Sequence, residues 1–314
     1  MARIRMVAIR LATAVPTVFI VATLTFGLLQ LIPGSPAEFL LGAGASRQQI
    51  GDLEHSLGLD QPLLTEYGQW LVRALHGDFG DSITSNTPAI QQVFKALPVT
   101  VSVAVVGLVL TAVVGIGLGL LAALRGGVWD TVVQTASSVA MAVPPFWLAS
   151  LLIYFLAIRY RIFYATDYSA LSDSPNQWLL HVTLPAVAVA VTAIGQVAFQ
   201  ARASLRETLG QDFLRTLRST GMSPGRILFK HVLRNGLVPV IAYLGMMFVF
   251  LLGGVVIVES IFSLPGLGAL MIQSVNNHDL TVVQATVVTF CVLVVITNLA
   301  VDLLVGWLDP RARA

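Results

Sequence analysis

Hydrophobic residues gather in six long stretches of the chain, and polar residues are concentrated between them. A helix that crosses the apolar core of a bilayer needs about 20 residues, because an α-helix rises about 1.5 Å per residue. Each stretch exceeds that length, so the pattern predicts an all-α integral membrane protein with six transmembrane helices. The predicted spans are Leu11–Ile32, Val99–Leu124, Thr135–Ile158, Leu179–Gln200, Leu237–Val258 and Val282–Leu304.

The composition agrees with a membrane protein and excludes a water-soluble one. Of the 314 residues, 56% are hydrophobic and only 11% are charged, whereas soluble domains contain about 25% charged residues. The stretches are continuous, so they do not fit the alternating strands of a transmembrane β-barrel. Small residues let neighbouring helices approach closely, and we expect such contacts at Gly115, Gly117, Gly119, Gly253 and Gly254.

The distribution of basic residues predicts the orientation. We expect the first stretch to be a retained helix, because it exceeds the apolar core of a signal peptide, about 7–15 residues. Six spans place both termini on one side, and basic residues favour the cytoplasmic face. Thirteen of the 18 Lys and Arg residues lie on the side of the termini, which is therefore predicted to be cytoplasmic. They are Arg3, Arg5, Arg10, Arg125, Arg202, Arg206, Arg215, Arg218, Arg226, Lys230, Arg234, Arg311 and Arg313.

The predicted outside segment, residues 33–98, is long enough to form a small helical cap. Ser46 and Gln49 have the spacing of a capping box, which predicts a short helix that ends near Leu57. Apolar and aromatic residues recur at helical spacing from Leu64 to Leu75, which predicts a second helix. The segment is either a packed external lid or a docking surface for a partner that arrives from outside.

The predicted inside segment, residues 201–236, carries the clearest local signals. Asp212 can cap a short helix, Phe213–Thr220, and Gly221 can adopt the left-handed conformation that ends it. Ser223 and Pro224 suit the start of a second helix. This helix–turn–helix either rests its basic residues on anionic lipid headgroups or presents a rigid surface to a cytoplasmic partner.

Motifs for catalysis or for independent energy use are missing from the sequence. It contains no phosphate-binding loop of the form G-x-x-x-x-G-K-[ST] and no H-E-x-x-H zinc motif. The formal net charge of +2 gives no support for nucleic-acid binding. Asp302 is the only acidic residue within a predicted span. Transport would therefore be passive or be driven by a partner.

The inside segment contains the run Gln211–Gly221, followed by His231–Asn235 and Pro239. This order resembles the "EAA" loop of type I ATP-binding-cassette (ABC) importers. Over nearly its whole length the chain is similar to a permease subunit of their dipeptide, oligopeptide and nickel branch, and to the first of the branch's two permease types. Further matching motifs are Leu57–Pro62, Gly77–Gly80, Leu97–Thr100 at the start of the second span, Pro144–Trp147, Glu259–Gly268 and Asp309–Arg311.

Two positions of the inside segment depart from the family's pattern. The namesake tripeptide aligns with Arg215–Leu217, so the literal Glu-Ala-Ala is absent, and Thr220 stands where lysine is typical. Leu217 is bulkier than the alanine that is usual in this branch. This difference concerns the fit of the loop to the ATPase subunit, not its role.

The resemblance implies the type I importer (MetI-like) permease fold and a complex in the bacterial plasma membrane. A paralogous permease would complete the transmembrane path, and two ATPase subunits, which hold ATP and Mg²⁺, would drive it. An extracytoplasmic binding protein would deliver the substrate, and membrane lipid would surround the chain. No cofactor or catalytic residue is expected in this chain itself. The implied ATPase contact is a coupling helix that contains Asp212, Phe213, Leu214, Arg215, Thr216, Leu217, Arg218, Ser219, Thr220 and Gly221.

The resemblance favours short peptides as substrate, with nickel, haem or another small metabolite as alternatives. A passive channel and a scaffold for cytoplasmic proteins are interpretations of another class. Gln196, Gln200 and Glu259 are candidates for lining the path, and packing within the bundle is their alternative role. The expected domains are 1–32 with the first span, the outside segment 33–98, the core 99–304 with the coupling loop 201–236, and the tail 305–314.

Overall fold

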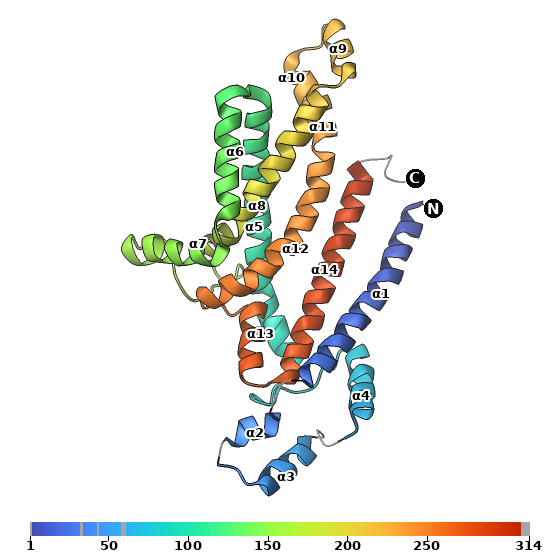
Figure 1. Cartoon of the computed structure of the whole chain (residues 1–314), viewed down its shortest axis with the longest axis vertical. Helices are drawn as coiled ribbons and strands as arrows, with labels where there is room; N and C mark the ends of the chain where they lie inside the picture. The colour runs from blue at the N-terminus through green and yellow to red at the C-terminus, as the bar shows by residue number, and fades with distance from the viewer. Residues whose placement is uncertain (1, 32–33, 43, 58–60, 309–314) are drawn as a thin grey trace. The chain divides into compact units, whose positions relative to one another are not determined.

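A computed structural model describes residues 2–31, 34–42, 44–57 and 61–308, with the backbone alone for 2–11 and 305–308. The described chain is built from helices (Figure 1). Five of these helices are long and apolar enough to span a membrane, and a bent helix pair gives a sixth span if it is counted as one. Several predicted features lie outside the described residues: Ile32, residues 58–60 of the Leu57–Pro62 motif, Asp309–Arg311 and the terminal basic side chains Arg3, Arg5, Arg10, Arg311 and Arg313.

The long helices extend beyond the apolar stretches that predicted them. They are α1 (Ala2–Leu29), α5 (Ala89–Arg125), α8 (Pro175–Leu209), α12 (Val238–Ile261) and α14 (Leu280–Leu308). Helix α5 begins at Ala89, so the Leu97–Thr100 motif lies within the helix and not at its first residue. Residues 89–98 continue the helix since their apolar face, with Val93 and Ala96, is buried against other helices.

The third predicted span, Thr135–Ile158, is wrong as a single straight helix. Helix α6 (Gly127–Ala142) is followed by α7 (Pro145–Leu152) and the π-helical segment η1 (Ile153–Arg159), and the two parts are bent by 94°. Proline lacks the N–H group that continues the helical ladder, and Pro144 and Pro145 stand at the break. At the break, the carbonyl of Val143 accepts a hydrogen bond from the buried hydroxyl of Thr192 in α8, at 3.2 Å.

Two compact units make up the chain, and each is described by itself. The first unit comprises Met1–Ile4, Val99–Leu264 and Ile296–Ala314. Helix α8 is central to it: 67% of its most apolar segment is buried, against 39% in α5 and α12. It packs on α6, α7 and α12 (Figure 1). The domain limits expected from the sequence stay a prediction.

Glycines of α5 allow this helix to approach α8 closely. A Cβ atom on Gly119 would lie 2.6 Å from Ala201 Cβ and 2.8 Å from the Ala198 carbonyl oxygen, and one on Gly115 would lie 2.9 Å from Val197. The expected contacts are therefore confirmed at Gly115 and Gly119. They are wrong at Gly117 and Gly253, where a Cβ would meet nothing within 4 Å, and at Gly254 the neighbour stands at an ordinary 3.6 Å.

The Gly119→Val variant is expected to lower stability, because its side chain would collide with the backbone of α8 and force the two helices apart. Overpacking of this kind costs about 1–3 kcal/mol. Gly117→Val is the matched control, since it adds the same atoms to the same helix in open space. Thermal unfolding of the two purified variants in detergent measures the difference. Equal midpoints would contradict the close packing of α5 on α8.

The second unit comprises Arg5–Pro98 and Pro265–Val295. Its shorter helices are α2 (Pro36–Leu41), α3 (Arg47–Leu57), α4 (Leu63–Leu75) and α13 (Leu267–Asn276). Both predicted helices of the outside segment are confirmed as α3 and α4. The capping box is confirmed too, because Gln49 N donates to Ser46 Oγ at 3.2 Å and Ser46 N donates to Gln49 Oε1 at 2.9 Å.

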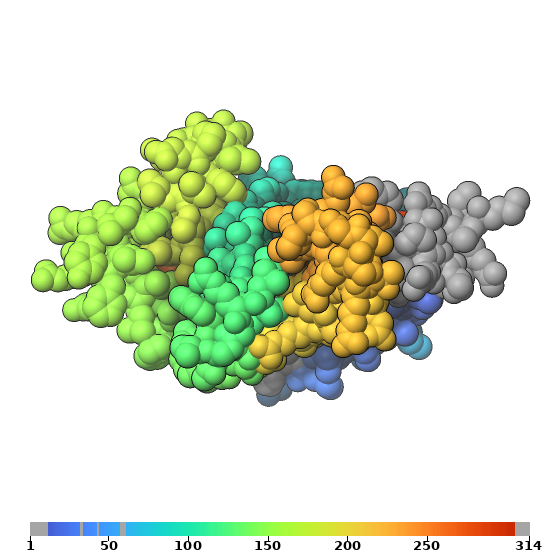
Figure 2. Space-filling model, turned by 90° about the horizontal axis from the view of Figure 1, so that it is seen from above, coloured from blue at the N-terminus to red at the C-terminus, as the bar shows by residue number. Residues whose placement is uncertain are grey.

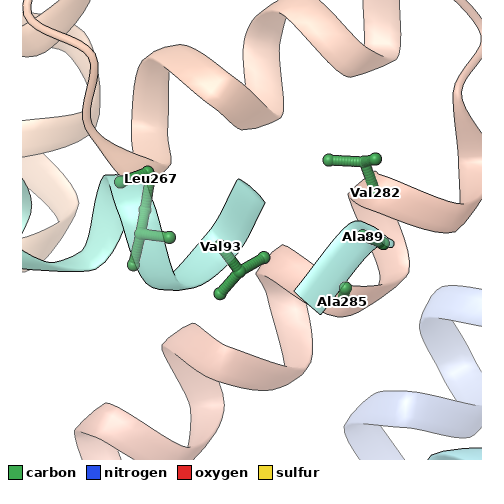
Figure 3. Packing of buried hydrophobic residues seen from close by; sticks show 6 residues of the cluster. Ala89, Val93, Leu267, Val282 and Ala285 are labelled. Atoms are coloured by element: carbon green, nitrogen blue, oxygen red, sulfur yellow. The ribbon is translucent and has the colours of Figure 1, made fainter. Parts of the chain in front are cut away.

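The core of the second unit joins three helices that are distant in sequence. Ala89 and Val93 of α5 pack with Leu267 of α13 and with Val282 and Ala285 of α14 (Figure 3). A buried carboxylate stands next to this core, at the start of α14. Asp279 is 1% exposed and accepts hydrogen bonds from Ser82 Oγ at 2.5 Å and Thr84 Oγ1 at 3.0 Å. The turn before α5 is thereby fastened to the start of α14.

Candidate functional site

The predicted helix–turn–helix is present at one end of the first unit. Figure 2 views this end from above and shows the atoms of the helix–turn–helix in gold and orange. Helix α8 ends at Leu209, and α9 (Asp212–Ser219) follows after two residues. The chain then continues through α10 (Pro224–Ile227), the π-helical segment η2 (Leu228–Val232) and α11 (Leu233–Gly236) into α12. We call residues 210–223, which comprise α9 and its two turns, the coupling segment.

The start of α9 differs by one residue from the prediction. Gln211 is the N-cap residue and has an extended backbone (φ −74°, ψ 142°), so the expected cap at Asp212 is wrong. Asp212 is the first helical residue, where its charge still favours the positive end of the helix dipole. Its ion pair with Arg215 is 3.7 Å long and fully accessible, so it adds little stability. Ser223 and Pro224 take the predicted N-cap and first helical positions of α10.

Gly221 ends α9 as predicted. Its φ angle of +76° lies in the left-handed region that favours glycine. Gly221 N donates to the Arg218 carbonyl at 3.1 Å, and Met222 N donates to the Leu217 carbonyl at 3.4 Å. These two bonds form a Schellman motif, and the apolar contact that often accompanies it is supplied by Met222 and Leu217 in one cluster. The direction in which the chain leaves α9 is therefore fixed.

The ten predicted coupling residues divide between two faces of the segment. Leu214 is 1% exposed and packs with Leu205, Ile227 and Val232, and Phe213 and Leu217 are half-buried against the same cluster. The other seven are exposed: Asp212, Arg215, Thr216, Arg218, Ser219, Thr220 and Gly221. The inner face thus fixes α9 to α8 and α10, while the outer face remains open to a partner.

Asp130 is a residue that sequence reasoning missed. It lies in the first turn of α6 and is 9% exposed. It accepts hydrogen bonds from Arg202 Nε and, at 2.9 Å, from Arg202 Nη2, and Arg206 Nη2 approaches it at 3.0 Å. Two arginines four residues apart share one helix face, but no sequence signal pairs them with α6. The contact ties α6 to α8 just before the coupling segment.

The three candidate path residues have different surroundings. Gln196 is half-buried, and its Oε1 accepts a hydrogen bond from the Tyr243 hydroxyl at 3.0 Å. Gln200 is half-buried one turn further along α8. Glu259 is 0% exposed, and its Oε1 accepts a hydrogen bond from Thr100 Oγ1 at 2.6 Å. Their role in lining a path stays a prediction.

Comparison with known proteins decides the family. Residues 115–314 match the family described as "Binding-protein-dependent transport system inner membrane component", and residues 3–104 match the N-terminal component of such transport systems. The chain belongs to this family. Similar proteins are named as peptide and dipeptide transport permeases, which confirms the expected resemblance to ABC importer permeases of the dipeptide branch.

Named relatives cover nearly the whole permease. A putative peptide transport system permease protein of Brucella abortus is 41% identical over 305 residues, which are 97% of each chain. The dipeptide transport system permease protein DppB of Bacillus subtilis is 35% identical over 299 residues, which cover 95% of the permease and 94% of the relative.

A solved structure of a transporter shares the fold. The inward-facing MetNI methionine ABC transporter matches with a TM-score of 0.52 and 18% identity, over 70% of the permease and 95% of the transporter chain. At that identity the likeness concerns the fold alone, and it confirms the MetI-like permease fold.

Proposed function

We propose that this permease and a paralogous permease form the transmembrane path of an ABC importer for short peptides. Two ATPase subunits, which hold ATP and Mg²⁺, drive the importer, and an extracytoplasmic binding protein delivers the peptide. The printed names of the relatives, which are peptide and dipeptide permeases, support the substrate class. The single observation that carries the mechanism is the way α9 is held in the coupling segment. Its inner face packs in a buried cluster, its end is fixed by two backbone hydrogen bonds, and its outer face is exposed.

We assign both termini and the coupling segment to the cytoplasm. The basis is the excess of Lys and Arg on that side, 13 of 18 residues, together with the positive-inside rule. The outer face of α9 then meets the ATPase subunits, and residues 33–98 lie outside the plasma membrane.

The proposed mechanism transmits force through packed helices. ATP-driven closure of the ATPase subunits moves α9, and α9 moves α8 because Leu214 and Leu205 belong to one buried cluster. Asp130 passes the displacement on to α6 through Arg202 and Arg206. Helices that move as rigid bodies can expose the path alternately to the two sides of the membrane. Gln196 and Gln200, which are half-buried, are the proposed contacts of the peptide within that path, and Glu259, which is fully buried, would support the path by packing.

Helix α7 and the segment η1 form a bent arm, and we propose that this arm contacts the second permease. Its aromatic side chains are about half exposed, at 52% for Phe146, 50% for Trp147 and 55% for Tyr154. Apolar side chains exposed within a membrane contact either lipid or another protein chain. A paralogous chain buried in the same membrane would cover them.

Reconstitution tests the proposal. Proteoliposomes that contain both permeases, the ATPase subunits and the binding protein are expected to accumulate a labelled dipeptide against its gradient only when ATP is enclosed with the ATPases. Vesicles without this permease are the control. Uptake without nucleotide would favour a passive facilitator, and uptake of nickel or haem in place of the dipeptide would overturn the substrate class.

A further inference from the structure

A cavity of about 760 Å³ lies within the second unit. It is a partly open cavity lined by the end of α1, the start of α2, helix α4, the turn after α4 and the start of α14, all of which belong to the same compact unit. Binding sites for small molecules typically measure about 300–1,000 Å³. The cavity is therefore large enough for a ligand, and its lining indicates the chemistry.

Three aromatic rings form one wall of the cavity. The ring centroids of Phe26 and Trp70 are 5.9 Å apart, and those of Trp70 and Phe79 are 6.5 Å apart. Phe26 and Trp70 are nearly fully buried in one cluster, and Phe79 packs against it, so the cluster offers the cavity a small apolar surface that an apolar side chain can contact.

Two polar side chains at the cavity make no hydrogen bond within the described chain, and in Trp70 the unbonded atom is itself buried. Trp70 is 5% exposed, and its Nε1 is unpartnered there. Gln284 is 7% exposed and lines the cavity without a hydrogen bond from its side chain to any described residue. Buried polar groups in native proteins are nearly always bonded. A donor-only indole and an amide that can donate and accept suit the C=O and N–H groups of a peptide.

Two of the three charged groups that line the cavity are acidic. Glu66 and Asp81 contribute carboxylates and Arg73 contributes one guanidinium, so the lining carries one more negative than positive charge. Glu66 is half-buried and accepts only long hydrogen bonds from Gln30 Nε2, at 3.4 and 3.5 Å. Burial raises the pKa of Glu66, and the hydrogen bond from Gln30 offsets this effect only in part. A ligand ammonium group would compensate that charge.

We propose that this cavity binds the N-terminal end of a short peptide. The α-ammonium group lies at Glu66 and Asp81, the first side chain lies against Phe26, Trp70 and Phe79, and the peptide amides bond Trp70 Nε1 and Gln284. The proposal rests on the proposed function for the class of ligand. It gives the permease itself a recognition step outside the membrane, separate from the binding protein and from the path.

Equilibrium binding to the purified full-length chain in phosphatidylcholine nanodiscs tests the proposal. The probe is the tripeptide phenylalanyl-alanyl-alanine, and its N-acetylated form lacks the ammonium charge. Acetylation is expected to weaken binding about tenfold or more, since a charge-assisted hydrogen bond is lost. Glu66→Gln is expected to weaken binding of the free tripeptide to a similar extent and to abolish the difference between the two peptides. Glu54→Gln, the same change in the neighbouring α3 and away from the cavity, is expected to bind normally.

Several outcomes would overturn the proposal. If the unaltered protein binds the free and the acetylated peptides with equal affinity, the proposal is wrong. This test does not depend on the folding of a variant. Unchanged peptide discrimination in a folded Glu66→Gln variant would overturn the proposal as well. Displacement of the tripeptide by phosphatidylethanolamine in the nanodiscs would assign the cavity to a lipid ammonium group instead.

The assay separates this proposal from the proposed function. It contains no ATPase and no nucleotide, so peptide binding that survives a failed transport experiment contradicts the transport proposal alone. Peptide transport by a chain that shows no peptide binding contradicts the cavity proposal alone.

Discussion

The Gly221→Val variant of the permease is expected to lose the stimulation of ATP hydrolysis by peptide. Gly221 has a φ angle of +76°, and a left-handed conformation costs about 1–2 kcal/mol for a residue with a side chain. That strain lowers the population of the ordered helix end by roughly 5- to 30-fold. The Schellman bonds at Gly221 and Met222 would open, and α9 would no longer present a fixed outer face.

Gly225→Val is the matched control for this prediction. Gly225 lies four residues later in α10, has no positive φ angle and has open space around the position of a Cβ atom. The measurement is ATP hydrolysis by the reconstituted importer with and without loaded binding protein. Stimulation that survives in Gly221→Val and is lost in Gly225→Val would place the coupling contact in α10 instead of α9.

The Leu214→Ala variant is expected to loosen the coupling segment by about 2–5 kcal/mol, the usual cost of removing a buried leucine side chain. Leu214 is 1% exposed within the cluster that joins α9 to Leu205 of α8. Its loss would let α9 move without moving α8. We therefore expect faster amide hydrogen exchange throughout α9 together with weaker transport per ATP hydrolysed.

Thr216→Ala provides the comparison on the opposite face of the same helix. Thr216 is exposed, so its replacement should leave hydrogen exchange in α9 unchanged and act only on affinity for the ATPase subunit. Unchanged exchange in Leu214→Ala would show that the cluster does not hold the helix. Accelerated exchange in Thr216→Ala would show that the outer face is not free.

Features set by local chain chemistry could be predicted from the sequence. The apolar stretches located the long helices, and the positions of Gly221, Ser223 and Pro224 followed from the backbone preferences of these residue types. The N-cap of α9 was missed by one residue, because Gln211 caps with its backbone conformation alone. Local signals therefore define an element well and its first residue less well.

Features set by contacts between distant segments could not be predicted. Pro144 and Pro145 allow either a kinked span or a sharp bend, and the 94° bend depends on packing against α8. Gly117 and Gly119 look alike in the sequence, yet only Gly119 faces α8. The pairing of Asp130 with Arg202 and Arg206 joins residues 72 and 76 positions apart, and no local pattern specifies it.

The hydrogen bond from Thr192 to the Val143 carbonyl makes the elbow between α6 and α7 depend on α8. In hydrocarbon, a backbone carbonyl without a donor costs several kcal/mol, so an elbow within the membrane would oppose any movement of α8 away from it. In the proposed mechanism, the arm would therefore move together with α8. A neighbouring subunit that leans on the arm would be pushed in step with the coupling segment, and the two halves of the transporter would be synchronised through protein contacts inside the bilayer.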